Sequence, residues 1–345
     1  MKVEIELTPV SPMHETLELA KLIDQLGADR LGVSDVVLFR DVYTTMALCA
    51  EHTGQVMIGP LVTNPYLRHP VSVATSFATL NEISHGRMFL GIGVGSGISQ
   101  LGLVQSKPAE LLEEFLVLFK AIVNGNSTAF HGNYFSSGEI TLPADLIGEI
   151  PVIVGSRSER VCKMAGRIAD GIVVGTREIS HRALSKYVSW IHGAAAEVGR
   201  PSHEIEIAPR VTVCISDDCD AALRSVVLYT AHYSTLGEYD ESVMEEWRYD
   251  SIKHSASRAS GWYFEPGVTY PDDLNELVGT ELIDMFTIAG TPIDCLKKLR
   301  TLKGLGFDNV SMNIAAVRRP GASIYEGTKE TLMGLQEIMP DIRAI

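Results

Sequence analysis

The amino-acid sequence predicts an α/β fold in which strands and helices alternate along the chain. Short apolar runs alternate with longer stretches whose apolar residues recur at helical spacing, over most of the 345 residues. Eight such runs are present, and the length is within the range of one α/β barrel. These units either close into a barrel or open into a doubly wound sheet, and the periodicity alone does not separate the two architectures.

Each predicted strand is a short apolar run, and the helical patterns lie between the runs. In chain order the strands cover Val3–Leu7, Arg30–Val33, Gln55–Ile58, Met88–Ile92, Pro151–Val154, Gly171–Val174, Ile205–Ile215 and Asn309–Ile314. After the first strand, Leu19, Ile23 and Leu26 share one helical face, and Gly27 follows where a helix end favours positive φ. After the third strand, Pro70 suits a first helical turn. Each helix is expected to pack back on its own strands.

Two segments interrupt this alternation. Residues 125–150 contain turn-forming residues and a short alternating stretch, which predict a small β excursion before the fifth strand. The larger interruption covers residues 239–280, and its first 32 residues hold seven aromatic residues. These aromatics favour either a substrate lid over a barrel mouth or, equally, a satellite cluster or subunit interface. Since no linker rich in Pro, Gly or Ser is present, we predict a single domain over residues 1–345.

Charge and cysteine content exclude several classes of function. The net charge of -14 argues against nucleic acid and anionic membranes as partners. No apolar stretch reaches the roughly 18 residues that a spanning helix needs, and the first residues lack a signal-peptide pattern. The five cysteines form no CxxC pair and the ten histidines form no metal-binding motif. We therefore predict a cytoplasmic protein without a metal site, whose thiols are small buried hydrophobes.

In an α/β barrel the active site lies where the strands end, and several predicted strand ends are rich in small residues. The run GIGVGSG at residues 91–97 is one of them. Its glycines do not have the GxGxxG spacing of a dinucleotide-binding loop, and no strand-borne acid follows about 20 residues later. The remaining interpretations are close approach of the backbone to a ligand or a simple bend of the chain.

A second strand end combines small residues with a cation. Gly155, Ser156, Arg157 and Ser158 lie between the fifth strand and a helix that is predicted to begin near Glu159. Backbone N–H groups, the helix dipole and the guanidinium together favour a phosphate site. Ordinary N-capping by one of the serines is the alternative, and the two interpretations are compatible.

Three stretches carry a resemblance to a known family. They are SDVVLFRDVYTTMAL, then GPLVTNPYLRHPVSVATSFATLNEISHGRMFLGIGVGSG, and PVIVGSRSERVCKMAGRIADGIVVG. The chain resembles the luciferase-like superfamily, most closely the F420-dependent methylenetetrahydromethanopterin reductases and related F420-dependent oxidoreductases. The resemblance covers roughly the first half of the chain and thins beyond residue 215. It implies a closed (β/α)8 TIM barrel with insertions at the C-terminal face of the strands.

The resemblance also implies a cofactor and its site. The cofactor is coenzyme F420, with FMN as the alternative, and its ring lies across the strand ends with one face on a non-proline cis peptide that matches Leu61–Val62. The implied cofactor-binding residues are Leu61, Val62, Thr63, Asn64, Gly93, Gly95, Ser96, Gly155, Ser156, Arg157 and Gly175.

Two positions depart from the family pattern. Many relatives have an acid followed by histidine at the second strand end, where this chain has Asp35 and Val36, and many place an acid at the position of Ser96. Asp35 thus remains as the candidate catalytic residue, acting as polar anchor or proton donor; capping of the following segment is the alternative. An electrophilic substrate such as an iminium or conjugated alkene needs no strong acid for hydride transfer.

The leading hypothesis is an F420-dependent oxidoreductase that moves hydride between the deazaflavin and a small or pterin-like organic substrate. An FMN-dependent monooxygenase is the alternative, since the same superfamily contains oxygen-using members. A non-catalytic cofactor-binding relative is a third hypothesis, motivated by Val36 and Ser96. The resemblance further implies a homodimer or a higher homo-oligomer.

Overall fold

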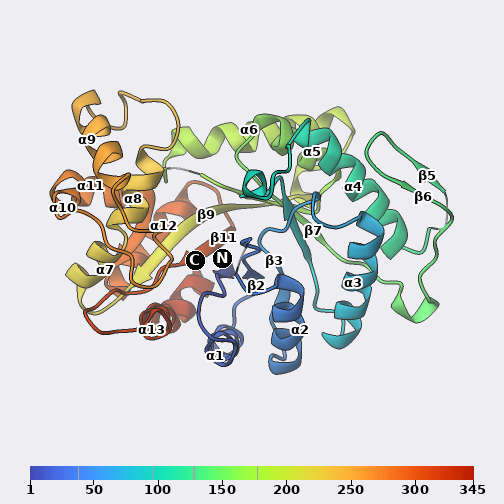
Figure 1. Ribbon diagram of the computed structural model, residues 1–345, viewed down its shortest axis with the longest axis horizontal. Helices are drawn as coiled ribbons and strands as arrows, with labels where there is room; N and C mark the ends of the chain where they lie inside the picture. The colour runs from blue at the N-terminus through green and yellow to red at the C-terminus, as the bar shows by residue number, and fades with distance from the viewer. Residues whose placement is uncertain (38, 96, 127–128, 177) are drawn as a thin grey trace.

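A computed structural model describes residues 1–37, 39–95, 97–126, 129–176 and 178–345, and parallel strands form its centre (Figure 1). All eight predicted strands are confirmed. They are β1 Lys2–Leu7, β2 Arg30–Val33, β3 Met57–Pro60, β4 Leu90–Gly93, β7 Val152–Ser156, β8 Gly171–Val174, β9 Glu206–Ile215 and β11 Asn309–Ile314. The third and fourth predicted strands start two residues too early, at residues 55 and 88 rather than 57 and 90.

The strands form a nearly closed TIM barrel. Their order is β3-β2-β1-β11-β9-β8-β7-β4, and every pair is parallel. Parallel bridges from Ile58 to Met88 and from Thr63 to Ile92 join β3 to β4. Because the two ends of the sheet meet, the barrel is confirmed and the doubly wound sheet is excluded.

One short strand escaped the sequence analysis. β10, Thr287–Gly290, pairs with the C-terminal half of β9 and lies outside the ring order. It begins directly after helix α11, Thr280–Phe286. Buried residues of α11, namely Leu282, Ile283 and Phe286, and the buried residues of β10 follow one another along the chain. Since no turn residue separates the two elements, hydrophobic periodicity does not mark where the helix ends and the strand begins.

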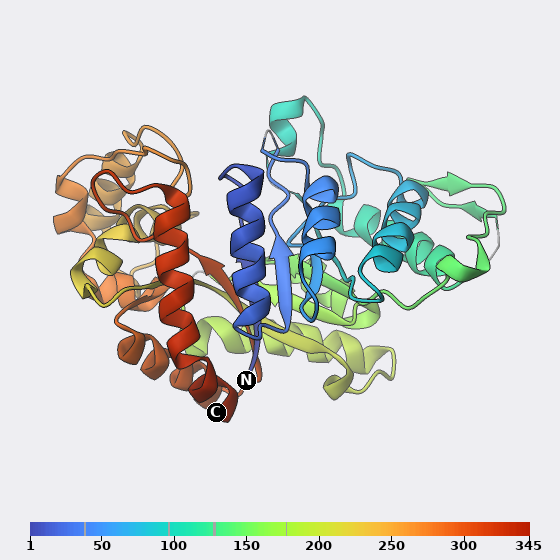
Figure 2. The ribbon, with the colours of Figure 1, turned by 90° about the horizontal axis from the view of Figure 1, so that it is seen from below.

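Helices cover the outside of the barrel (Figures 1 and 2). They are α1 Met13–Gln25, α2 Val42–His52, α3 Pro70–Ile83, α4 Pro108–Val123, α5 Glu159–Ile168, α6 His181–Glu197, α12 Pro292–Gly304 and α13 Ile324–Ala344. The predicted helix ends are confirmed: Gly27 has a φ of 79° after α1, and Pro70 occupies the first turn of α3. Three short 3-10 segments are also described, η1 Ile98–Leu101, η2 Ala144–Leu146 and η3 Ser202–Glu204.

Both interruptions have structure of their own. The first contains a small antiparallel hairpin, β5 Phe130–His131 and β6 Ser136–Ser137, which confirms the predicted β excursion. In the second, α9 Glu246–Ala256 and α10 Asp273–Leu277 pack with α7 Cys219–Ser225, α8 Val227–Ser234 and α11. Their buried residues form a hydrophobic cluster separate from the main core, at one end of the molecule in Figure 1.

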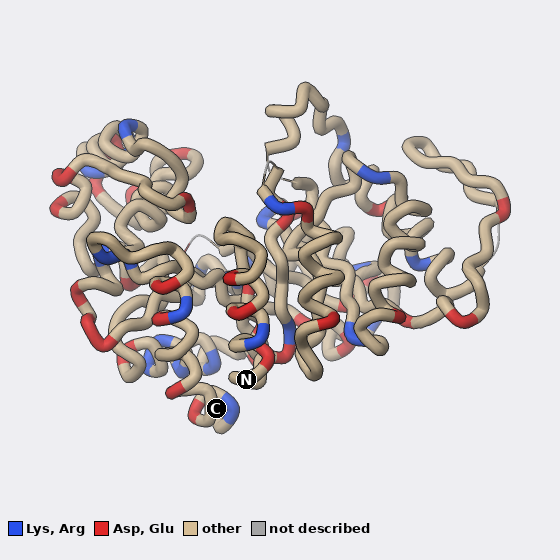
Figure 3. Tube along the Cα trace, turned by 60° about the horizontal axis from the view of Figure 1, so that its bottom comes forward, with Lys and Arg blue, Asp and Glu red and all other residues tan. Residues whose placement is uncertain are grey.

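The surface and the thiols agree with the composition. Acidic and basic residues are interspersed along the trace (Figure 3). Cys49, Cys162, Cys214 and Cys295 are buried free thiols, and Cys219 is half-buried. Within the described residues, no helix has the length and apolar character needed to cross a membrane, and no group of three or more His, Cys, Asp or Glu is placed to hold a metal ion.

Candidate active site at the mouth of the barrel

A cavity of about 500 Å³ lies at the C-terminal ends of the barrel strands. Most of the residues that the sequence assigns to a site line it: Asp35, Leu61, Val62, Gly95, Gly155, Ser156, Arg157 and Gly175. The sequence expectation that strand ends build the site is thus consistent with the geometry. Ser96 lies outside the described residues.

The peptide bond between Leu61 and Val62 is cis, as the family resemblance implies. Leu61 is buried, and Val62 packs between two glycines from neighbouring strands. A Cβ on Gly155 would lie 2.7 Å from Val62 Cγ1, and a Cβ on Gly93 would lie 2.9 Å from Val62 Cγ2. Any larger residue at either glycine would therefore displace Val62 from the cavity floor. Gly93 itself is buried behind Val62 and does not line the cavity.

Thr63 and Asn64 also lie behind the cavity wall. Thr63 is buried, and its hydroxyl donates a hydrogen bond of 2.7 Å to Asp35 Oδ2. Asn64 is buried as well, and its Oδ1 accepts the backbone N–H groups of Tyr66 and Leu67 at 3.0 and 3.2 Å. The observed role of Asn64 is thus to shape the turn after the cis bond. Thr63 orients Asp35.

Asp35 is a half-buried carboxyl at the cavity wall. Burial raises the pKa of Asp35 above its usual value, against the opposing effect of the Thr63 hydrogen bond. Asp35 does not cap α2, whose N-cap is Asp41, with a side chain that accepts from the N–H of Thr44. Residue 38, three positions after Asp35, lies outside the described residues, so capping of the segment directly after β2 stays an alternative to the role of a perturbed carboxyl at the cavity wall.

The loop between β7 and α5 presents polar groups to the cavity. Ser158 occupies the N-cap position of α5, yet its side chain makes no capping bond, so simple capping does not account for this serine. Ser156 Oγ instead accepts the N–H of Ser158 at 3.0 Å. Arg157 is exposed beside Gly175, where a Cβ would come within 2.8 Å of Arg157 Cγ. The absence of that Cβ lets the arginine stem lie across the end of β8.

A buried polar cluster that the sequence analysis missed forms part of the lining. Arg210, on β9, donates to both carboxylate oxygens of Glu6, on β1, at 2.5 and 3.0 Å. Ser34 donates to Glu6 Oε1 at 2.9 Å, and the hydroxyls of Thr8 and Ser34 are 3.0 Å apart. The sequence feature that could have revealed this cluster is a charged residue within an apolar strand. In a closed barrel, a glutamate or arginine at such a position points into the interior.

An aromatic wall completes the cavity. Tyr233 comes from α8, and Tyr263 and Phe264 come from the segment between α9 and α10. Tyr233 stacks on Tyr229 with ring centroids 4.3 Å apart, and Phe264 meets Phe39 edge to face at 5.8 Å. Tyr249 of the aromatic segment is buried in the separate cluster, which confirms the satellite cluster, while Tyr263 and Phe264 line the cavity. A role of this segment as a substrate lid stays a prediction.

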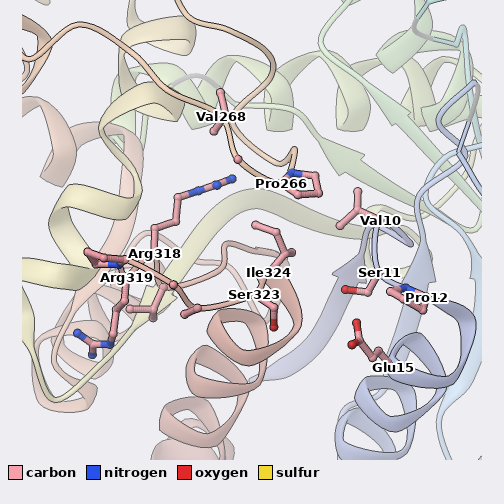
Figure 4. A pocket seen from close by; sticks show the side chains of 15 residues that line it. Val10, Ser11, Pro12, Glu15, Pro266, Val268, Arg318, Arg319, Ser323 and Ile324 are labelled. Atoms are coloured by element: carbon pink, nitrogen blue, oxygen red, sulfur yellow. The ribbon is translucent and has the colours of Figure 1, made fainter.

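A second cavity of about 600 Å³ lies beside this wall, between the N-terminal ends of α1 and α13 (Figure 4). A small space of about 40 Å³ separates the two cavities, and Tyr263 and Phe264 border it. Figure 4 shows Arg318 extending toward the segment of Pro266 and Val268, while Arg319 turns away from it. Arg318 Nη2 donates to the carbonyl oxygens of Tyr263 and Glu265 at 2.6 and 3.0 Å.

Comparison with known proteins agrees with this architecture. The family described as luciferase-like monooxygenase matches residues 2–309. The chain belongs to this family. It is 28% identical over 314 residues to the 5,10-methylenetetrahydromethanopterin reductase of Methanolobus tindarius, covering 89% of this chain and 92% of that protein. The corresponding reductase of Archaeoglobus fulgidus is 25% identical over 315 residues, covering 90% of this chain and 92% of the relative.

Solved structures of the family share the fold over nearly the whole chain. The coenzyme F420-dependent tetrahydromethanopterin reductase from Methanopyrus kandleri superimposes with a TM-score of 0.84 at 24% identity, covering 99% of both chains. An F420-dependent secondary alcohol dehydrogenase has a TM-score of 0.73 at 17% identity, covering 97% of this chain and 99% of the other. Because the named relatives are oxidoreductases, the chain is an enzyme of the oxidoreductase class.

Proposed function

We propose that the protein is an F420-dependent oxidoreductase that transfers hydride between the deazaflavin and an electrophilic carbon of a small or pterin-like organic substrate. The observation that carries this proposal is the cavity floor, in which Val62 follows a cis peptide bond and packs against two glycines beside the loop of Ser156 and Arg157. Relatives whose names specify F420 dependence favour the deazaflavin over FMN.

The residues present fit a planar ring that bears a phosphate. Gly95, Gly155 and Gly175 line the cavity without side chains, so backbone comes close to a bound ring. The end of α5 next to the cavity makes no side-chain capping bond, and it offers N–H groups and the positive end of the helix dipole to an anion. Arg157 adds a guanidinium at the same end.

The cofactor, when bound, supplies the hydride chemistry, and the protein has to align the partners and exclude water. Val62, at the cavity floor, would support one face of the bound ring. Tyr263 and Phe264 cover the opposite side and remove water from the substrate position. The ion pair of Glu6 and Arg210 has no net charge, so it contributes fixed dipoles to the cavity lining.

Affinity for the two candidate cofactors tests the proposal. Titration of the purified protein with F420 and, separately, with FMN is followed by quenching of cofactor fluorescence. We expect tight binding of F420 and weak binding of FMN. Tight FMN binding without F420 binding would overturn the proposal in favour of a flavin monooxygenase.

Turnover separates an enzyme from a binding protein. Reduced F420 is mixed with a panel of imine, iminium and enone acceptors, together with 5,10-methylenetetrahydromethanopterin, and its oxidation is followed by absorbance. We expect oxidation with at least one acceptor that has an electrophilic C=N bond. Binding without oxidation by any acceptor would favour the non-catalytic alternative.

The organisation of the chain is part of the proposal. We place residues 1–345 in one domain that assembles as a homodimer or higher homo-oligomer, as the family resemblance implies, and that acts in the cytoplasm. A single cooperative unfolding transition and a dimeric mass by light scattering are the expected results. Two separated transitions, or a monomeric mass at micromolar protein, would contradict these expectations.

A further inference from the structure

We propose that Tyr233 is the proton donor of this active site, with Arg210 and Tyr263 stabilising the phenolate that remains after the proton has left. The inference rests on the proposed function and extends it from acceptors that are already cationic to neutral imines. It answers a question that the sequence raises, because the family's usual histidine is replaced by Val36 in this chain.

The position of Tyr233 carries the inference. Its side chain lines the cavity, and its ring is held by stacking on the fully enclosed Tyr229, with an interplanar angle of 25°. A donor must keep one position relative to the substrate, and this stacking supplies it. Tyr229 is itself buried on α8, which gives the stacked ring of Tyr233 a fixed support.

Two polar side chains, Arg210 and Tyr263, line the same cavity as Tyr233. The half-buried guanidinium of Arg210 interacts electrostatically with Tyr233, and Arg210 is kept charged by its two bonds to Glu6. The ring of Tyr263 meets that of Tyr233 edge to face, with centroids 6.1 Å apart. Burial raises the pKa of Tyr263 well above its usual value, so Tyr263 keeps its proton and can donate a hydrogen bond when Tyr233 becomes negative. A cation and a hydrogen-bond donor thus both face the developing phenolate.

The other acids of the cavity are less suited to this role. Glu6 already accepts three hydrogen bonds, two from Arg210 and one from Ser34, so both of its carboxylate oxygens are engaged within the protein. Asp35 accepts from Thr63 at the end of β2. Tyr233 instead belongs to the aromatic wall of the cavity, together with Tyr263 and Phe264.

The proposed step is balanced for a neutral imine. The imine carbon receives hydride from the reduced deazaflavin, and the C=N π electrons move to the nitrogen. The nitrogen takes the proton from Tyr233 Oη, so an N–H bond forms as the O–H bond breaks. The imine is reduced to an amine and the cofactor is oxidised. The phenolate then regains a proton from water after the product has left.

A matched pair of acceptors tests the donor. Reduced F420 is mixed with neutral dihydroisoquinoline, which needs a proton, and with its N-methyl iminium salt, which does not. Tyr233→Phe is expected to lower kcat for the imine about a hundredfold, the usual contribution of a positioned acid, with little change for the iminium. Tyr263→Phe is expected to lower kcat for the imine roughly tenfold, as one hydrogen bond to a developing charge is lost.

Two controls separate chemistry from structure. Tyr239→Phe removes a hydroxyl from the same aromatic region outside the cavity and should change neither rate. Binding of the neutral imine to protein loaded with oxidised F420, where no hydride is available, is measured by calorimetry. Tyr233→Phe should weaken this binding roughly fivefold, as expected for one lost hydrogen bond.

The outcomes distinguish the two proposals. Equal losses of kcat with both acceptors, or no loss with the imine, would overturn the assignment of Tyr233 and leave the proposed function standing. Failure of the unmodified protein to bind F420 would instead contradict the proposed function, and the donor assignment would fall with it. Thermal unfolding of each variant near the unmodified midpoint excludes misfolding as the cause of a selective loss.

Discussion

The carboxyl side chain of Glu4 is buried in the barrel, on the same strand and the same face as Glu6. Burial raises the pKa of the Glu4 carboxyl from 4.5 to about 7, although Ser311 and Arg30 act in the opposite direction. Glu6, two residues further along β1, has Arg210 as a direct partner. Of these two carboxyls on one strand face, only Glu6 meets a guanidinium at hydrogen-bond distance.

Glu4 makes stability depend on pH. Between pH 4.5 and about 7 the folded protein keeps this proton while the unfolded chain has lost it, so the free energy of unfolding falls as pH rises through this window. Glu4→Gln should flatten that fall by about 3 kcal/mol, the value of a shift of this size. Urea unfolding at several pH values measures the slope. An unchanged slope would show that Glu4 titrates normally in the fold.

Gly155 is the residue whose lack of a side chain most directly shapes the cavity. In Gly155→Ala the new Cβ would collide with Val62 at 2.7 Å, which is expected to cost about 1–3 kcal/mol of stability and to weaken F420 binding about tenfold. Gly138→Ala is the matched control, because a Cβ there meets nothing within 4 Å. Fluorescence titration and thermal unfolding measure the two effects. Equal behaviour of the two variants would contradict the packing argument.

At the scale of elements, Arg87 joins three segments near the start of β4. Its guanidinium donates to the backbone oxygens of Ala50, Thr53 and Val56 at 3.0, 3.0 and 2.8 Å. A further bond of 3.1 Å reaches Thr53 Oγ1. These oxygens belong to the end of α2 and the approach to β3, so one side chain satisfies carbonyls that the helix end leaves open.

Removal of this guanidinium should be costly. Arg87→Met is expected to lower the free energy of unfolding by about 3 kcal/mol, because several part-buried carbonyls lose their donor. Arg167→Met serves as the comparison, since Arg167 makes an exposed ion pair of 3.5 Å with Glu197 and should cost less than about 0.5 kcal/mol. Urea unfolding measures both. A similar small effect of the two substitutions would count against the role assigned to Arg87.

Arg318 plays a comparable part for the aromatic wall, because it holds the carbonyls of Tyr263 and Glu265 from the far side. Arg318→Met should loosen this segment, so that limited proteolysis within residues 258–270 accelerates and the KM for a neutral imine rises. Arg319→Met is the control, because the neighbouring arginine is paired with Asp218 and Glu330 instead. Unchanged proteolysis in Arg318→Met would mean that the wall is held by its ring contacts alone.

At the scale of the whole molecule, the cavity draws on residues distant in sequence, from Glu6 on β1 to Asn313 on β11. A ligand that binds only this assembled cavity stabilises the complete fold by mass action. F420 at about 100 times its dissociation constant should add about 2.7 kcal/mol to the free energy of unfolding and raise the midpoint of thermal unfolding. Removal of the ligand by dialysis should reverse the shift. Saturating F420 without any shift would contradict specific binding to the folded state.

Much of the fold follows from local pattern. The eight apolar runs became the eight barrel strands because short β-branched segments between helical patterns have few other ways to bury themselves. The boundaries of β3 and β4 were less well predicted: both strands begin two residues later than expected, although Met88 already forms an isolated bridge to Ile58. Closure was decided by the bridges between β3 and β4, which no periodicity contains.

The site divides in the same way. Gly155, Arg157 and Gly175 were predicted because glycines and a cation at the end of a strand can be recognised from the neighbouring residues alone. Glu6, Arg210 and Tyr233 are separated by up to 227 positions in the sequence, and only closure of the barrel brings them to one cavity. By itself the sequence determined which segments form strands and helices, since that choice depends on neighbouring residues. The tertiary structure alone decided which charges and hydroxyls meet, because a pairing distance depends on how every strand in the ring is placed.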